Sequence, residues 1–182
     1  MTQPDHTKDT VSQSGRAAIY ARVAPGARTQ TTQPQTATLI ALANEQGFSN
    51  EHIIVFEGVY TSAKRPIAKR GALSDLLTAI MQEDQTPDQE PIKAIYVSSE
   101  DRLFRDANTV DLAYFISVCA DHGIQLLTPT ATYDFTVPDQ AALFRFQCEQ
   151  AACYIAEQIG KLMQRGRPHG QAGQKPVEEQ QS

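Results

Sequence analysis

Four short apolar segments, separated by stretches with helical spacing, constrain the fold of this chain more than any other sequence feature. The apolar segments cover residues 17–23, 53–56, 92–97 and 124–127. Apolar residues recur every three or four positions between them, as on one face of a helix. Continuously apolar strands that alternate with amphipathic helices are typical of a parallel sheet covered on both faces. The sequence therefore predicts an α/β fold in which helices flank a mostly parallel sheet.

The segments between the strands give the remaining elements. A helix containing Leu39, Leu42 and Ala43 is expected to end at Gly47, because glycine is common just past a helix terminus. The other expected elements are a basic loop over 58–71, a helix with Leu73, Leu76, Leu77 and Ile80, an acidic linker over 82–91, a loop over 98–105, a helix over 110–120 and a loop over 128–138.

A long helix without proline is predicted over residues 140–164. At 1.5 Å per residue it would extend about 37 Å, more than one domain needs to cover its sheet. Either the helix packs on its own domain throughout, or its far half packs against a partner subunit. Its apolar residues at three-four spacing are Leu143, Phe146, Ala152, Ile155, Ile159 and Leu162.

The 182 residues are enough for one domain with polar tails. We expect a disordered tail over 1–15, a domain over 16–139, the long helix over 140–166 and a second disordered tail over 167–182. The polar N-terminus has no signal sequence, and no apolar run is long enough to span a bilayer. The cysteines, Cys119, Cys148 and Cys153, lack metal-binding spacing, which favours a cytoplasmic protein without a metal or cofactor.

The net charge of −5 argues against a dedicated nucleic-acid binder, but the charges are segregated. Basic residues cluster over 64–70 and again over 161–175, whereas acidic residues gather over 83–90. A locally basic surface on an acidic protein is therefore compatible with the composition.

Arginines follow three of the predicted strands, at the sheet edge where ligands bind in this class of fold. Arg22 ends the first strand, Arg70 lies after the second, and Arg102 and Arg105 follow the third. Guanidinium groups that converge repel one another unless an anion neutralises them, and their planar forks suit phosphate oxygens. The alternative is a set of surface arginines, paired with carboxylates such as Asp101, Asp106 and Glu57.

These segments, in this order, resemble the catalytic domain of serine recombinases of the resolvase/invertase family. Residues 17–24 read AAIYARVA, similar to the family pattern A-x-Y-x-R-V-S, and Gln35 matches the glutamine that opens the first helix. Residues 70–73 read RGAL in place of R-P-G-L, and residues 101–105 read DRLFR, which matches D-R-L-x-R. The likeness covers about residues 16–166.

The resemblance implies site-specific recombination of DNA, including integration, as in a mobile element. In that reaction a serine hydroxyl attacks a DNA phosphodiester, forming a phosphoserine link and releasing a 3′ hydroxyl, without a metal. Arg22, Arg70, Arg102 and Arg105 would hold the phosphate. Asp101 would orient them or assist proton transfer, and Gln35 would support the site. The long helix would form a dimer or tetramer, or join an active recombinase, and would cross the DNA.

Ala24 departs from the family at the position of the nucleophilic serine, because a methyl group cannot attack phosphorus. The residues Pro25, Gly26 and Glu57 also depart, which favours natural divergence over a deliberate Ser→Ala variant. The sequence therefore predicts a pseudoenzyme that binds DNA phosphate. It would be a non-cleaving subunit, a regulator or a remnant of a mobile element. Two alternatives remain. A displaced hydroxyl of Thr29, Thr31 or Thr32 could keep recombinase activity, or the domain could bind a phosphorylated metabolite, although it lacks a glycine-rich phosphate loop.

A second departure follows the long helix, where the family carries a helix-turn-helix or a larger DNA-binding region. About 16 polar residues remain here, too few for a folded module. Basic residues surround the end of the helix, namely Lys161, Arg165 and Arg167, and residues 165–168 read RGRP. An extended basic segment of this kind can lie in an A·T-rich minor groove, or it can be a solvated tail.

Overall fold

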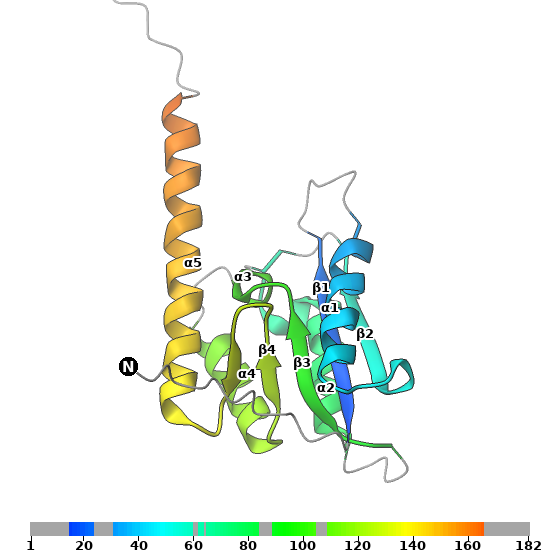
Figure 1. The fold of residues 1–182 in the computed structure, drawn as a ribbon. Helices are drawn as coiled ribbons and strands as arrows, with labels where there is room; N and C mark the ends of the chain where they lie inside the picture. The colour runs from blue at the N-terminus through cyan, green and yellow to red at the C-terminus, as the bar shows by residue number, and fades with distance from the viewer. Residues whose placement is uncertain are drawn as a thin grey trace, which may run out of the picture.

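The computed structural model describes residues 15–23, 31–59, 62–63, 65–83, 89–104 and 109–165. They form a five-stranded sheet flanked by helices, which confirms the predicted fold class (Figure 1). In chain order the elements are β1 (Arg16–Arg22), α1 (Gln33–Glu45), η1 (Asn50–His52), β2 (Ile53–Gly58), η2 (Ile67–Lys69), α2 (Gly71–Met81), β3 (Ile92–Val97), α3 (Glu100–Leu103), α4 (Thr109–Asp121), β4 (Gln125–Leu127), β5 (Thr132–Asp134) and α5 (Pro138–Arg165).

The sheet has the strand order β2-β1-β3-β4-β5. Strands β1 to β4 run parallel to their neighbours, and β5 is antiparallel to β4. Tyr20 pairs with Phe56 on one side and with Val97 on the other. The carboxyl ends of β1, β2 and β3 therefore lie together at one edge, as the sequence predicted.

Alternate residues of β1 enter two separate apolar layers, because successive side chains of a strand point to opposite faces. Ala17 and Ile19 pack on the α1 side with Leu39. Ala18 and Tyr20 pack on the side of α2 and α4, in the larger cluster. Helices on both faces explain why β1 is apolar throughout.

Helix α1 ends at Glu45, and the predicted glycine stop, Gly47, lies two residues further on. The glycine has a φ of 98°, a left-handed conformation that side chains disfavour, and the next amide, that of Phe48, donates to the carbonyl of Ala43 at 3.1 Å. The turn returns the chain to β2, at the edge of the sheet.

Three segments predicted as loops contain regular structure, and the first is the 3-10 turn η2 within the predicted loop 58–71. Residues 132–134 form β5 within the predicted loop 128–138, and residues 100–103 form α3 within the predicted loop 98–105. Both elements are too short to repeat a hydrophobic period, and contacts with the rest of the fold hold them in place. In β5 only the ring of Tyr133 is buried.

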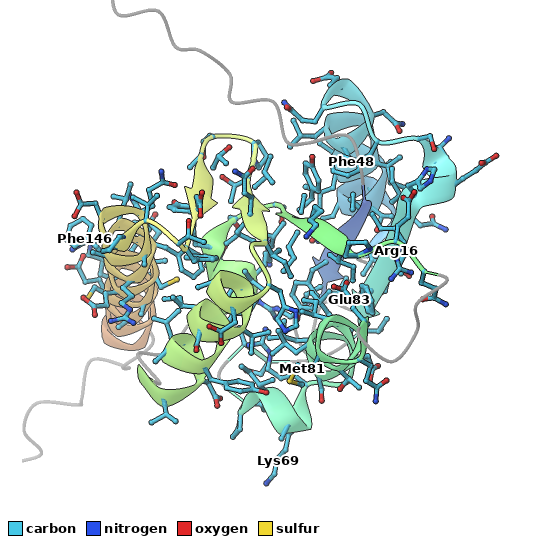
Figure 2. The ribbon with its side chains drawn as sticks, turned by 90° about the horizontal axis from the view of Figure 1, so that it is seen from below. Arg16, Phe48, Lys69, Met81, Glu83 and Phe146 are labelled. Atoms are coloured by element: carbon cyan, nitrogen blue, oxygen red, sulfur yellow. The ribbon has the colours of Figure 1, made fainter. Side chains whose placement is uncertain are left out.

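The predicted long helix is present as α5, and it begins at Pro138, two residues before the expected start. Phe144 and Cys148 are buried against the domain, whereas Leu143, Phe146 and Tyr154 are 49%, 53% and 63% exposed. The far half of α5 extends beyond the sheet (Figure 1), and Phe146 points away from the domain (Figure 2). The tails over 1–14 and 166–182 lie outside the described residues.

In the described part of the chain, no helix combines the length and hydropathy that a bilayer crossing requires. Nor do three or more His, Cys, Asp or Glu side chains gather there as metal ligands would.

Candidate anion-binding site

The site is built around α3, a single helical turn directly after β3. Ser99 precedes the turn in an extended conformation, and its hydroxyl donates to the carboxylate of Asp101. A helix of four residues satisfies almost none of its own carbonyl groups, so other donors must pair with them.

Arg22 reaches α3 from the end of β1. Its Nε donates to the carbonyl oxygen of Arg102 at 3.0 Å, and its Nη2 donates to that of Asp101 at 3.4 Å. The residue is fully buried. The side chain therefore joins the last residue of β1 to the backbone of α3.

Arg70 reaches the same carbonyl groups from the other side, since it lies just before α2. Its Nη2 donates to the carbonyl of Arg102 at 3.2 Å. Its Nη1 donates to the carbonyl of Leu103. Nη2 also donates to the hydroxyl of Tyr20 at 3.1 Å, and Cζ lies 5.7 Å from the centre of the Phe104 ring. The residue is 1% exposed.

Two cations thus meet the carbonyl end of one helical turn, where the backbone dipoles favour positive charge. The structure brings the side chains of Arg22 and Arg70 to the backbone carbonyl of Arg102. It also assigns them different surroundings. Arg22 and Arg70 are buried against backbone carbonyls, whereas Arg102 is only partly buried.

Several buried polar atoms at this site have no hydrogen-bond partner among the described residues. They are Nε of Arg70, Nε of Arg102 and Oε1 of Gln35. The Nε2 of Gln35 donates to the carbonyl of Arg22 at 3.3 Å, so the glutamine contacts the last residue of β1. Buried polar atoms are nearly always paired, and two cationic donors without acceptors are suited to an anion.

Glu57 does not pair with the arginines through any hydrogen bond that the described residues show. Its Oε1 accepts from the hydroxyls of Thr32 at 2.8 Å and Thr36 at 3.0 Å. The hydroxyl of Thr32 is therefore directed to a carboxylate, whereas Thr31 is exposed. Thr29 lies outside the described residues.

Other predicted site residues lie away from α3 or outside the described residues. Ala24, Arg105 and Arg167 belong to the latter group, as does Asp106. Lys161 is exposed on the far half of α5, with its Nζ 4.0 Å from Glu157. Arg165 is the last residue of that helix.

Sequence reasoning missed the contact between Tyr133 and Glu100. The hydroxyl of Tyr133 donates to Oε1 of Glu100 at 2.6 Å, and burial together with this hydrogen bond raises the pKa of Tyr133 above its usual value. No sequence pattern indicated either residue, because both lie in segments too short to show a hydrophobic period. Tyr20, by contrast, stands in the segment that resembles A-x-Y-x-R-V-S.

The fold is similar to that of solved serine recombinase catalytic domains. The N-terminal catalytic domain of TP901-1 integrase superposes with a TM-score of 0.54 at 18% identity, covering 81% of this chain and 98% of that one. A resolvase family site-specific recombinase from Streptococcus pneumoniae gives 0.51 at 14% identity, covering 84% and 99%. The C-terminal catalytic domain of ISC1926 TnpA, an IS607-like serine recombinase, gives 0.50 at 17% identity, covering 82% and 99%.

The family model of the resolvase N-terminal domain matches residues 17–175 of this chain. The chain belongs to that family. No curated protein sequence matches it significantly.

Proposed function

We propose that this chain is a DNA-binding member of the serine recombinase family that holds a phosphate without cutting the strand. The observation that carries the proposal is the partly buried guanidinium group of Arg102, whose Nε–H donor has no acceptor among the described residues. Arginine cannot lose its proton to escape this situation, so an anion completes the site best. The structural neighbours, an integrase and a site-specific recombinase, favour DNA as the source of that anion.

Ala24 explains why binding would not lead to cleavage. It lies two residues beyond Arg22, at the position that the family pattern gives to serine. No hydroxyl is available there to form a phosphoserine link. The chain would then act as a pseudoenzyme, either in a homodimer or tetramer or as a non-cleaving partner of an active recombinase.

Burial suggests a division of labour among the arginines. Arg22 and Arg70 hold α3 by its carbonyl groups, and Arg102 presents a guanidinium group toward the phosphate. Arg105 would complete the contact, since it follows two residues after Leu103. Preorganised donors of this kind bind an anion without reorganising first.

The test is binding of a fluorescent DNA duplex, measured by anisotropy over a range of salt concentrations. Affinity in the range of about 10⁻⁴ to 10⁻⁶ M and a strong salt dependence are expected where phosphate contacts dominate. Arg102→Gln should weaken binding and reduce the salt slope by about one. Arg16→Gln is the matched control, because Arg16 begins β1 at the opposite edge of the sheet. Equal losses in both variants would contradict the proposal, and stabilisation by phosphorylated metabolites without DNA binding would support the metabolite alternative.

A second candidate function is cleavage by a displaced hydroxyl. The hydrogen bond of 2.8 Å between Thr32 and Glu57 favours it, because a carboxylate can accept a proton from an attacking hydroxyl. This candidate requires a covalent DNA adduct on denaturing gels that Thr32→Val abolishes. Absence of an adduct from the unaltered chain would exclude it.

A further inference from the structure

Tyr133 contacts both the long helix and the helical turn of the site. Its hydroxyl donates to Glu100, the first residue of α3, at 2.6 Å. Its ring meets the ring of Phe144, on α5, edge to face with centroids 5.1 Å apart. Tyr133 is 1% exposed, so water does not compete for its hydroxyl. One side chain thus connects α5 to α3, which lie next to each other (Figure 1).

A second series of contacts leads from α5 to the arginines through aromatic rings. Phe144 lies 6.2 Å from Phe115 on α4, and Phe115 lies 5.5 Å from Phe104. The guanidinium group of Arg70 lies over Phe104 at 5.7 Å. The packing of α5 and the position of Arg70 therefore share one cluster of rings.

The turn α3 depends on such contacts because it cannot hold its own position. One helical turn fixes several backbone dihedrals for very few hydrogen bonds, so it is not stable alone. Its carbonyl end is held by Arg22 and Arg70. Its amino end is held by the hydrogen bond that the hydroxyl of Tyr133 donates to the carboxylate of Glu100. Loss of the second attachment leaves the Ser99–Asp101 hydrogen bond, the buried Leu103 and the two arginines to fix the turn.

We propose that Tyr133 is a positioning residue for the phosphate site: by holding Glu100 it fixes α3, and it thereby transmits the packing of α5 to the affinity of Arg102 for phosphate. The inference rests on the proposed function, since it concerns how strongly the same site binds. Tyr133 itself does not touch the anion. It acts through the carboxylate of Glu100 and the backbone of α3.

A double-mutant cycle on DNA binding by the full chain tests this role. Tyr133→Phe removes one hydroxyl and keeps the ring, and we expect binding about 3- to 10-fold weaker, the usual effect of one lost hydrogen bond. The loss should largely disappear in the Arg102→Gln background, because coupled residues are not additive. Glu100→Gln keeps an oxygen acceptor and should retain most of the affinity, whereas Glu100→Ala should not. Tyr114→Phe is the matched control, since the hydroxyl of Tyr114 donates to the sulfur of Met81 on α2, away from α3.

The outcomes separate this inference from the proposed function. If Arg102→Gln leaves DNA binding unchanged, the proposed site is wrong and the inference falls with it. If Arg102→Gln weakens binding but Tyr133→Phe has no effect, or the same effect in both backgrounds, only the positioning role is overturned. Thermal unfolding of each variant provides the second measurement. A purely structural role would lower the melting temperature of Tyr133→Phe without altering the coupling to Arg102.

Discussion

The Nε of Arg22 donates to the carbonyl oxygen of Arg102 at 3.0 Å, across 80 residues of sequence. The bond joins the ends of β1 and α3, the two segments whose sequences most resemble the serine recombinase pattern. It also shows that an arginine of such a site can be part of the framework that holds another arginine in place.

Arg70→Lys should destabilise the fold. Lysine is a compact point charge that cannot reach the hydroxyl of Tyr20 and two carbonyl groups at once. Leaving buried groups unpaired costs about 2–4 kcal/mol of the free energy of unfolding. Urea denaturation followed by circular dichroism measures this change. Arg65→Lys, at an exposed position in the same loop, should alter the free energy by less than about 0.5 kcal/mol. Equal midpoints for the two variants would contradict the prediction.

Ala24→Ser should restore covalent chemistry if only the nucleophile is missing. Loss of an essential nucleophile can lower a rate by about a millionfold, while the arginines still bind the phosphate charge. The assay needs supercoiled DNA and a borrowed C-terminal DNA-binding module. Denaturing gels should show a phosphoserine-linked 5′ end with the serine variant alone. An adduct with Ala24 present would point to another nucleophile. Binding without an adduct in the serine variant would mean that more than the nucleophile has been lost.

Self-association through α5 is expected, because its helical stripe continues beyond the buried Phe144 and Cys148. Replacing both Ile155 and Ile159 with lysine should shift the protein toward monomer in sedimentation velocity. The matched control replaces the exposed Gln150 and Glu157 with lysine, which should leave the oligomeric state unchanged. A monomeric parent protein at tens of micromolar would rule the prediction out.

Truncation after Gln164 should weaken DNA binding and lower its salt dependence. The segment carries Arg165 and Arg167, and each phosphate contact contributes about 0.9 to the salt slope. Replacing only these two arginines with glutamine should reproduce most of the effect. If truncation changes neither the affinity nor the slope, the terminal basic residues are solvated and do not contact DNA.

The free energy of unfolding should fall as the pH rises from 8 to 10. Burial, with repulsion from the carboxylates of Glu100, Glu149 and Asp101, raises the pKa of Cys148 to about 12. An unfolded thiol titrates near pH 8.5, so above that pH the native state binds the extra proton and stability decreases. The decrease should approach about 1.4 kcal/mol for each pH unit and each buried thiol. Cys148→Ala should reduce this dependence measured by urea denaturation, whereas replacing the exposed Cys153 should not.

The order of strands and crossing helices was predictable because buried strands and amphipathic helices leave periodic patterns. The strand β5 and the turn α3 were not, because three or four residues cannot show a period. Tyr133 in β5 is fixed by a contact with Glu100 that lies 33 residues earlier. Such a contact depends on the tertiary fold and not on local sequence.

The meeting of Arg22, Arg70 and Arg102 followed from the parallel strands, which place their carboxyl ends at one edge. Their individual surroundings did not follow, since a strand pattern does not show whether an arginine faces solvent or a backbone carbonyl. The carboxylate of Glu57 illustrates the same limit. It was a candidate partner for the arginines, and the structure places the hydroxyls of Thr32 and Thr36 on it instead.

The helix α5 is attached to the domain near one end only, so a small rotation at the attachment produces a large movement of its free end. Phe144 and Cys148 attach it near one end, and about 17 residues continue beyond them for about 25 Å. A tilt of about 10° at the attachment would move the tip by about 4 Å, comparable with the rise of about 3.4 Å per phosphate along the axis of one DNA strand. The aromatic rings that contact Phe144 lie at this attachment. If the basic end of the helix contacts DNA, as proposed, a repacking there too small to disturb the sheet would change which phosphates it can reach.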